Sequence, residues 1–259
     1  MATEYDNIAR DYQQSKKLPF RECIEWYTYR RMLGAVSGKN ILDLACGEGF
    51  YSRRVKQLGA ATVVGVDISS KMIAMAKRQE AARPLGIDYI VGDASEPVVH
   101  GNFDMVIASY LLNYARSRQE LLAFCRTIAV NLKAGGRFVS INNNPDHPPQ
   151  TFEACRRYGF NKTLSGALVE GAAIAYEFYR GGRAFKFDNY YLTRASHNWA
   201  FRRAGLTAIH WQDVTVSPDC RRRHGMAYWQ DFLTHAPIIG IESGRPAAPN
   251  QQLANAREF

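Results

Sequence analysis

Short apolar runs alternate with amphipathic segments through the first half of the chain. The apolar runs have the length of buried strands, and they begin at Ile41, Thr62, Ile87, Phe103 and Arg137. Helical segments are expected between them, at residues 51–58, after Ser69 or Ser70, and at 121–133, where Ser117 and Glu120 have capping-box spacing and Gly135-Gly136 ends the helix. Strands that alternate with helices predict an α/β fold with a doubly wound, mostly parallel sheet.

The last third of the chain contains a predicted β-hairpin. Residues 175–188 hold two alternating segments joined by Gly181-Gly182, a pair that favours a two-residue hairpin turn. The resulting register pairs Phe178 with Phe185, Tyr176 with Phe187, and Glu177 with Lys186. One face of the hairpin is therefore expected to be aromatic, and the other to carry an opposite-charge pair. Residues 146–171 show no clear periodicity, so no element is predicted there.

Further segments complete the expected architecture. Apolar runs at 206–216 and 238–242 bring the predicted sheet to seven strands, with helices at 196–204 and 226–235. Two more helices, at 4–13 and 20–36, precede the first strand. We divide the chain into an N-terminal helical lid (1–37), an α/β core (38–144), an insertion with the hairpin (145–193), the C-terminal part of the core (194–244) and a disordered tail (245–259).

Composition limits the classes of partner. The net charge of +9 is spread along the chain, and the basic run Arg221 to His224 falls in a predicted surface loop, so no nucleic-acid partner is expected. No apolar run approaches the roughly 20 residues that span a bilayer, so we expect no membrane association. The five cysteines, among them Cys23 and Cys220, form no Cys/His cluster, which favours reduced thiols and no metal site. Because nothing near the N-terminus has a signal-peptide layout, a cytoplasmic location is expected. A monomer or a homodimer is expected.

A glycine-rich turn follows the first strand. Gly47 and Gly49 let the backbone approach a ligand, and the N–H groups of the following helix face it. Eighteen residues after Gly49, Asp67 ends the second strand, where a carboxylate can hold ribose hydroxyls. The pattern predicts a nucleotide-type cofactor. The dinucleotide fingerprint G-x-G-x-x-G is incomplete, because Ser52 stands in place of its third glycine.

The residues around this turn resemble the first motif of class I S-adenosylmethionine-dependent methyltransferases. That motif is hydrophobic-L-D-x-x-C/G-G-x-G, which Leu42 to Gly49 match closely. Further matches follow in the family's order, at Asp67, Gly92-Asp93-Ala94, Phe103-Asp104 and Leu132 to Arg137. The resemblance implies that the cofactor is S-adenosylmethionine and the product S-adenosylhomocysteine.

The resemblance also implies cofactor-binding residues: Asp43, Ala45, Gly47, Gly49, Asp67, Ile68, Asp93, Ala94 and Ser109. Asp67 would accept from both ribose hydroxyls, Ile68 would pack on the adenine, and Asp93 would accept from the adenine amino group. Asp43 would face the cationic amino end of the cofactor.

The N-terminal helices are similar to the lid of small-molecule methyltransferases of the glycine N-methyltransferase type. By that likeness Arg21 would pair with the methionine carboxylate, and Tyr12 would close over the sulfonium. The order of residues at the start of the chain also resembles bacterial secondary-metabolism enzymes, including the azapteridine (toxoflavin-type) N-methyltransferases.

The methyl acceptor is expected between the lid, the end of the fourth strand and the aromatic hairpin face. The candidate residues are Tyr110, Asn113, Tyr114, Tyr176, Phe178, Phe185 and Phe187. Such a surface suits a small, flat, aromatic or heteroaromatic molecule, although hairpin faces of this kind also serve as core or as dimer contacts.

Methyl transfer needs alignment and exclusion of water more than a nucleophile, so no catalytic residue is assigned. His147 and His197 are candidate bases that we expect at the surface. N- and O-methylation remain open. An RNA-modifying methyltransferase, which would carry a basic face beside the cofactor, is one alternative, and a non-catalytic protein of the same fold is another.

Overall fold

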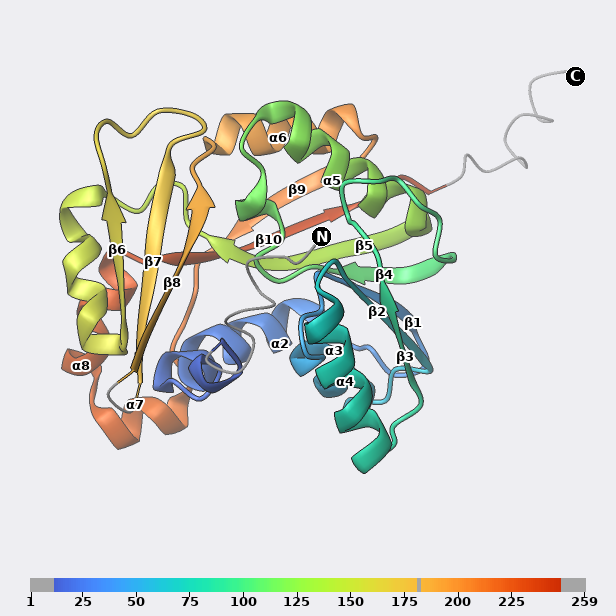
Figure 1. Cartoon of the computed structure of the whole chain (residues 1–259), viewed down its shortest axis with the longest axis horizontal. Coiled ribbons are helices and arrows are strands. Elements are labelled where there is room, and N and C mark those ends of the chain that lie inside the picture. The colour runs from blue at the N-terminus through green and yellow to red at the C-terminus, as the bar shows by residue number, and fades with distance from the viewer. Residues whose placement is uncertain (1–11, 181–182, 248–259) are drawn as a thin grey trace, which may run out of the picture.

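Two β-sheets form the framework of the computed structural model, which describes residues 12–180 and 183–247 (Figure 1). The larger sheet has seven strands in the order β3-β2-β1-β4-β5-β10-β9. They are β1 (Asn40–Leu44), β2 (Thr62–Asp67), β3 (Ile87–Val91), β4 (Phe103–Ile107), β5 (Leu132–Asn143), β9 (Thr207–Gln212) and β10 (Ile238–Gly244). Strands β1 to β5 pair in parallel, whereas β10 is antiparallel to β5 and β9. The predicted seven-stranded, mostly parallel sheet is confirmed.

Helices cover both faces of the large sheet. Figure 1 shows α3 (Phe50–Gln57) and α4 (Ser70–Ala82) below it and α5 (Arg118–Asn131) and α6 (Arg194–Arg203) above it. Adjacent residues of β1 pack on opposite faces of the sheet, since Ile41 belongs to the apolar cluster beneath it and Leu42 to the cluster above it. This alternation of two buried faces is what a doubly wound sheet requires, and the prediction is confirmed.

The smaller sheet contains the predicted hairpin and one additional strand. It consists of β6 (Phe160–Leu164), β7 (Ala173–Arg180) and β8 (Arg183–Tyr190), all antiparallel. The structure pairs Phe178 with Phe185, Tyr176 with Phe187 and Glu177 with Lys186, as predicted. The expected turn at 181–182 lies outside the described residues.

The segment without predicted elements is partly regular. It contains η3 (Pro149–Tyr158), a 3₁₀-helix, and then β6. The buried side chains of η3 are Phe152, Cys155 and Tyr158, spaced by three residues. A 3₁₀-helix has three residues per turn, so a search for a period of 3.6 does not detect it.

Two other predictions about local structure were wrong. The helix expected to reach residue 133 ends at Asn131, and β5 begins at Leu132, so that Gly135-Gly136 lie within the strand. Leu132 is fully buried and pairs with Phe103 of β4, so tertiary packing overrides the helical tendency of this stretch. The basic run Arg221 to His224 lies in a helix, α7 (Pro218–His224), and not in a loop.

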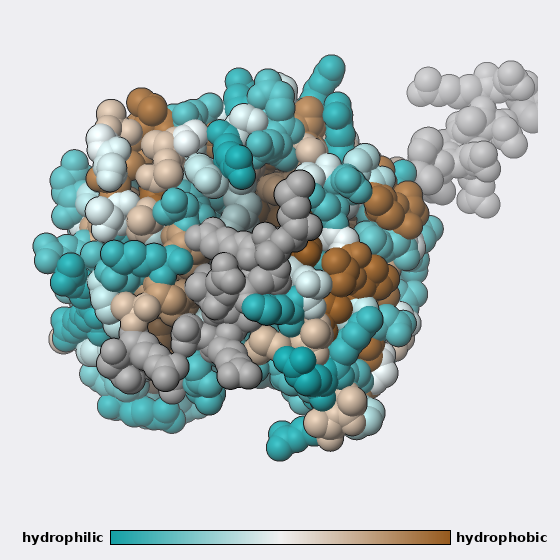
Figure 2. All heavy atoms as spheres, in the orientation of Figure 1, coloured by the Kyte–Doolittle hydropathy of each residue, from teal (hydrophilic) through white to brown (hydrophobic). Residues whose placement is uncertain are grey.

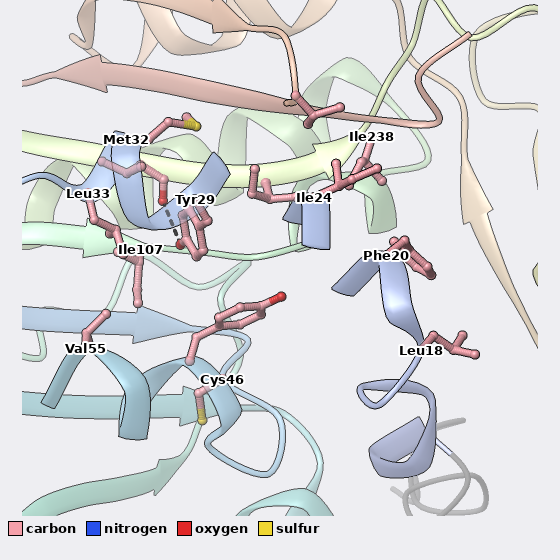
Figure 3. Packing of buried hydrophobic residues seen from close by; sticks show 14 of the residues in the cluster. Leu18, Phe20, Ile24, Tyr29, Met32, Leu33, Cys46, Val55, Ile107 and Ile238 are labelled. Atoms are coloured by element: carbon pink, nitrogen blue, oxygen red, sulfur yellow. Dashed lines mark hydrogen bonds between the residues drawn. The ribbon is translucent and has the colours of Figure 1, made fainter. Parts of the chain in front are cut away.

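The lid helix lies between the two sheets. It begins as a π-helix, η1 (Arg21–Trp26), and continues as α2 (Tyr27–Leu33). Its apolar side chains Phe20, Ile24 and Leu33 form one buried row (Figure 3), and the ring centroid of Phe20 lies 5.1 Å from that of Phe160 in β6. The predicted helix at 20–36 is confirmed, with an earlier end. Most of the helix expected at 4–13, and the tail beyond residue 247, lie outside the described residues.

A disulfide joins the lid to the C-terminal part of the chain. Cys23 of η1 is bonded to Cys220 of α7, 197 residues away, and the Ser217 N–H donates to the Cys23 carbonyl at 2.8 Å. The expectation that all thiols are reduced is therefore wrong for this pair. Sequence spacing does not reveal such a bridge, because the two cysteines come together only in a buried cluster that also holds Trp229 and Phe232 of α8 (Met226–Thr234).

Candidate functional site

A cleft with a free volume of about 320 Å³ opens at the carboxyl ends of β1, β2 and β4. The chain order reverses between β1 and β4, and ligands of open α/β sheets bind at such a point. Eight of the predicted cofactor-binding residues line this cleft: Tyr12, Ala45, Gly47, Asp67, Ile68, Asp93, Ala94 and Ser109. Segments far apart in the sequence are therefore brought to one site.

The turn after β1 is held in left-handed conformations. The φ angles are +57° at Ala45, +58° at Gly47 and +83° at Gly49. A Cβ atom on Gly49 would lie 2.2 Å from the Tyr89 hydroxyl, so a side chain at this position would displace that ring. A Cβ on Gly47 would meet nothing within 4 Å. Gly49 is thus required by packing behind the cleft, and Gly47 leaves the backbone open on the cleft side.

Two carboxylates of the cleft are oriented by backbone N–H groups. Asp67 accepts from the N–H of Gly47 and from the N–H of Ser69, each at 2.8 Å. Asp93 accepts from the N–H of Ser95 at 2.8 Å. These bonds fix both side chains in place before any ligand arrives, and Asp67 also ties the turn after β1 to the end of β2.

An apolar side chain flanks the two carboxylates. Ile68 is 51% exposed, and Figure 2 shows hydrophobic surface over the part of the molecule that holds β2 and β3. An isoleucine exposed at the rim of a cleft offers a flat apolar contact to a ligand ring.

Four aromatic rings surround a cation on the lid side of the cleft. The Lys16 ammonium lies 4.9 Å from the ring centroids of Tyr12 and Tyr51, 5.6 Å from that of Phe50 and 5.7 Å from that of Tyr110. We call these four rings the aromatic cage. The faces of such rings attract positive charge, so this part of the cleft suits a cation. Sequence reasoning found only Tyr12 of this group as a cofactor residue.

Three predicted cofactor residues lie outside the cleft lining. Gly49 packs behind it, as described above. Asp43 is 1% exposed and accepts from the Ser52 hydroxyl at 2.5 Å. Burial raises the pKa of Asp43 to about 7, and the nearby Asp67 carboxylate adds to this shift. Arg21 is 3% exposed and lines a neighbouring cavity.

Arg21 belongs to a buried network that sequence reasoning missed. The fully buried Glu25 carboxylate accepts from the Arg21 guanidinium and from the hydroxyls of Tyr51 and Tyr110. Burial alone would raise the pKa of Glu25, but the charge of Arg21 holds it below its ordinary value. The spacing of four residues between Arg21 and Glu25 on one helix was the available signal. The network joins the lid to two rings of the aromatic cage.

A second cavity separates the lid from the small sheet. Five of the predicted acceptor residues line it, namely Tyr110, Tyr114, Tyr176, Phe178 and Phe187, and we call it the aromatic cavity. Phe178 and Phe187 are stacked with centroids 5.7 Å apart. The aromatic cavity has a free volume of about 20 Å³ and shares Tyr12, Tyr110 and Tyr114 with the cleft. Of the other two predicted residues, Phe185 packs near Tyr12, with centroids 6.4 Å apart, and Asn113 lines a third cavity.

The two candidate bases are buried, contrary to expectation. His147 is 3% and His197 7% exposed, and both line the third cavity. The Nδ1 atom of His147 lies 2.9 Å from the Lys162 amine, and that of His197 lies 2.9 Å from the Thr193 carbonyl. Their burial results from the packing of β6 and α6 around them, which the polar local sequence does not reveal. Sequence reasoning did not find Lys162.

Two features are absent from the described part of the chain, a cluster of metal-ligating side chains and a helix of membrane-spanning character. Among residues 12–180 and 183–247, no three His, Cys, Asp or Glu side chains gather into a possible metal site. None of the helices in these ranges has the length and apolar character to cross a bilayer.

Comparison with known proteins gives consistent matches. Residues 41–136 match the family described as a methyltransferase domain. The chain is 34% identical over 217 residues to a demethylmenaquinone methyltransferase of Lactococcus lactis, covering 80% of this chain and 82% of that protein. It is 32% identical over 119 residues to a ribosomal protein L11 methyltransferase of Neisseria meningitidis, covering 46% of this chain but 36% of that protein.

A solved structure shares the fold. The S-adenosylmethionine dependent methyltransferase from Mesorhizobium loti superposes with a TM-score of 0.61 at 22% identity, over 85% of this chain and 97% of that one.

Proposed function

Because the chain belongs to the class I S-adenosylmethionine-dependent methyltransferases, we propose that it methylates a small, flat, aromatic or heteroaromatic molecule. The acceptor binds between the lid and the aromatic face of the small sheet. One observation carries this proposal: the cleft and the aromatic cavity share Tyr12, Tyr110 and Tyr114. A methyl group held at the lid end of the cleft would therefore lie next to the aromatic cavity.

The residues of the cleft fit S-adenosylmethionine. Asp67 has the position and the fixed orientation to accept from the ribose hydroxyls. Asp93 and the Ala94 N–H would hold the adenine edge, and Ile68 would cover the adenine face. The backbone around Gly47 is open for the methionine part.

The aromatic cage suits the sulfonium. It already holds one positive charge, the Lys16 ammonium, and its rings favour a second kind of cation equally. Two cations repel each other at this distance. A sulfonium bound at the cage would therefore favour a position of Lys16 outside it.

Methyl transfer requires the protein to bind the cofactor and the acceptor, to align them and to exclude water. The cofactor, when bound, supplies the methyl group for an in-line displacement by an acceptor nitrogen or oxygen. The stacked rings of Phe178 and Phe187 hold a flat acceptor in one plane. A free volume of about 20 Å³ is too small for a ring, so the aromatic cavity would have to widen to admit an acceptor.

Several finer assignments stay predictions. Arg21 is paired with Glu25 and lies outside the cleft lining, so its role in the cofactor site is a prediction. The same holds for Asp43, for the likeness of the lid to glycine N-methyltransferase and of the chain to azapteridine N-methyltransferases, and for the domain boundaries. The cytoplasmic location and the monomeric or homodimeric state are predictions as well.

The main rival function is methylation of a macromolecule. The relative that acts on ribosomal protein L11, and the alternative of an RNA substrate, both point in that direction. The described cleft lining contains two lysine or arginine residues, Lys16 and Arg116, and Lys16 is turned into the aromatic cage. An RNA-binding surface needs several cations directed outward, so the cleft favours the small molecule.

The test is turnover on the two kinds of acceptor. Release of S-adenosylhomocysteine is measured with a panel of heteroaromatic metabolites and, separately, with ribosomal RNA and ribosomal proteins. Phe187→Leu should raise the KM of an active metabolite roughly three- to tenfold, the worth of an aromatic pair. Phe138→Leu makes the same change at a buried position beside Phe201, on the far side of the large sheet, and should leave KM unchanged. Turnover with the macromolecules alone would refute the proposal.

A further inference from the structure

A small cavity with both polar and apolar lining residues adjoins the aromatic cavity on the side away from the cleft. Its free volume is about 30 Å³, and we call it the inner cavity. It shares Asn143, Tyr176 and Asn189 with the aromatic cavity, so a few side chains separate the two spaces. The cleft, the aromatic cavity and the inner cavity thus adjoin one another in that order, and the last two lie against the small sheet.

The wall of the small sheet changes character along this path. Phe178 and Phe187 line the aromatic cavity, whereas Lys162 and Asn189 extend the same inner face of the sheet toward the inner cavity. In the sheet register Lys162 is opposite Tyr176. The wall is therefore aromatic near the cleft and hydrogen-bonding at its far end.

Lys162 is the unusual residue of the inner cavity. It is 4% exposed, and its amine lies 2.9 Å from His147 Nδ1, the one hydrogen-bond partner it has among the described residues. The amine also lies 4.1 Å from the ring centroid of Phe152. No aspartate or glutamate is among the residues that line the cavity. Burial without a carboxylate partner lowers the pKa of Lys162 to about 7. Burying an amine in this way reduces the stability of the fold, whereas an apolar side chain at the same position would not.

The neighbouring amides are fixed in place. The Asn143 side chain donates to the Asn189 side-chain oxygen at 3.0 Å, and the Asn143 N–H donates to the Asn113 side chain at 3.2 Å. Asn113 in turn donates to the Tyr110 carbonyl at 3.2 Å, at the edge of the aromatic cavity. Bonds of this kind hold the amides at the boundary between the two cavities in defined orientations.

The size of the inner cavity limits what it can hold. A volume of about 30 Å³ is enough for one water-sized group and is far below the roughly 150 Å³ of a cavity that binds benzene. It admits one oxygen-sized group and excludes a ring. Because the lining supplies an amine and amides but no acid, the group that fits is rich in electrons.

We propose that the inner cavity is a specificity subsite that takes a single oxygen of the acceptor, a ring carbonyl or ring oxyanion, with Lys162 as its hydrogen-bond donor. This inference rests on the proposed function, because the acceptor ring must lie in the aromatic cavity for its substituent to reach Lys162. The subsite selects among flat molecules by one substituent, and it fixes which ring edge faces the methyl group.

The test compares two probes that differ by one oxygen. Binding of 4-quinolone and of quinoline to the full chain, loaded with S-adenosylhomocysteine, is measured by calorimetry. The wild-type protein should bind 4-quinolone at least tenfold more tightly, which corresponds to about 1.4 kcal/mol. This comparison needs no variant and so does not depend on the folding of one.

Two variants then assign the preference to Lys162. Lys162→Met should bring the two probes within twofold of each other and leave the affinity for quinoline unchanged. Lys186→Met is the matched control, because Lys186 lies in the same sheet with a side chain that is 66% exposed, and it should keep the preference. Equal binding of both probes to the wild-type protein would overturn the subsite. An equal loss of both probes in Lys162→Met would assign Lys162 a structural role and also overturn it. In either case the proposed function would stand, whereas failure of both rings to bind the wild-type protein would contradict the aromatic acceptor itself.

Discussion

Replacing Asp67 by asparagine tests the cofactor site at its most specific contact. Both carboxylate oxygens of Asp67 already accept backbone N–H groups, from Gly47 and Ser69. The ribose hydroxyls of the cofactor would add two donors to the same carboxylate. An amide keeps one acceptor oxygen and loses the charge, and a hydrogen bond to a charged group is worth about 1.5–3 kcal/mol. We expect a loss of about 2 kcal/mol in binding free energy, a roughly 30-fold increase in Kd.

The assay is calorimetric titration with S-adenosylhomocysteine, accompanied by thermal unfolding of each variant. Thermal unfolding is measured because the asparagine NH₂ group would face a backbone N–H donor, and this contact lowers the stability of the protein whether or not the ligand is bound. Asp88→Asn removes the same charge from an exposed position of β3 outside the cleft lining and should change Kd less than twofold. A folded Asp67→Asn protein with the wild-type Kd would refute the assignment of Asp67 to the ribose.

Two further outcomes are expected from the buried charges. Glu25→Gln leaves the buried Arg21 guanidinium without its counter-charge and should lower the free energy of unfolding by about 3–5 kcal/mol. The control Glu22→Gln changes a side chain that is 62% exposed and should lower the same free energy by less than about 1 kcal/mol. Equal effects of the two variants in urea unfolding would contradict the burial of the network. Asp43, with its pKa raised to about 7, keeps a proton in the folded state that the unfolded chain releases near its ordinary value of 3.8. Its contribution to stability is therefore complete below about pH 4 and is lost as the pH rises to 7, by up to about 4 kcal/mol. The loss between about pH 5 and about pH 8 should be smaller in Asp43→Asn, and an identical loss in both proteins would show that Asp43 is not the group responsible.

The framework of the fold follows from local patterns. The apolar runs, the serine caps at Ser69 and Ser117 and the pairing of Phe178 with Phe185 depend on residues close in sequence, and the structure confirms each. The family motifs lie at strand ends, so they also locate most of the cleft. Where the rules are local, the sequence is sufficient.

The remaining features depend on contacts between distant segments. The disulfide joins Cys23 of the lid to Cys220 of α7, and the Arg21 guanidinium donates to the hydroxyl of Tyr110, which follows β4. Lys162 of β6 is buried against His147, which precedes η3. No property of the individual residues distinguishes them from surface residues. Sequence reasoning therefore missed the disulfide and the burial of Lys162.

The most direct test of the account is a crystal structure of the protein with S-adenosylhomocysteine. We predict that the nucleoside lies in the cleft, with its ribose hydroxyls within hydrogen-bond distance of Asp67, its adenine beside Ile68 and its sulfur near Tyr12 and Tyr110. An empty cleft at saturating ligand, or the ligand bound elsewhere on the molecule, would contradict the central claim.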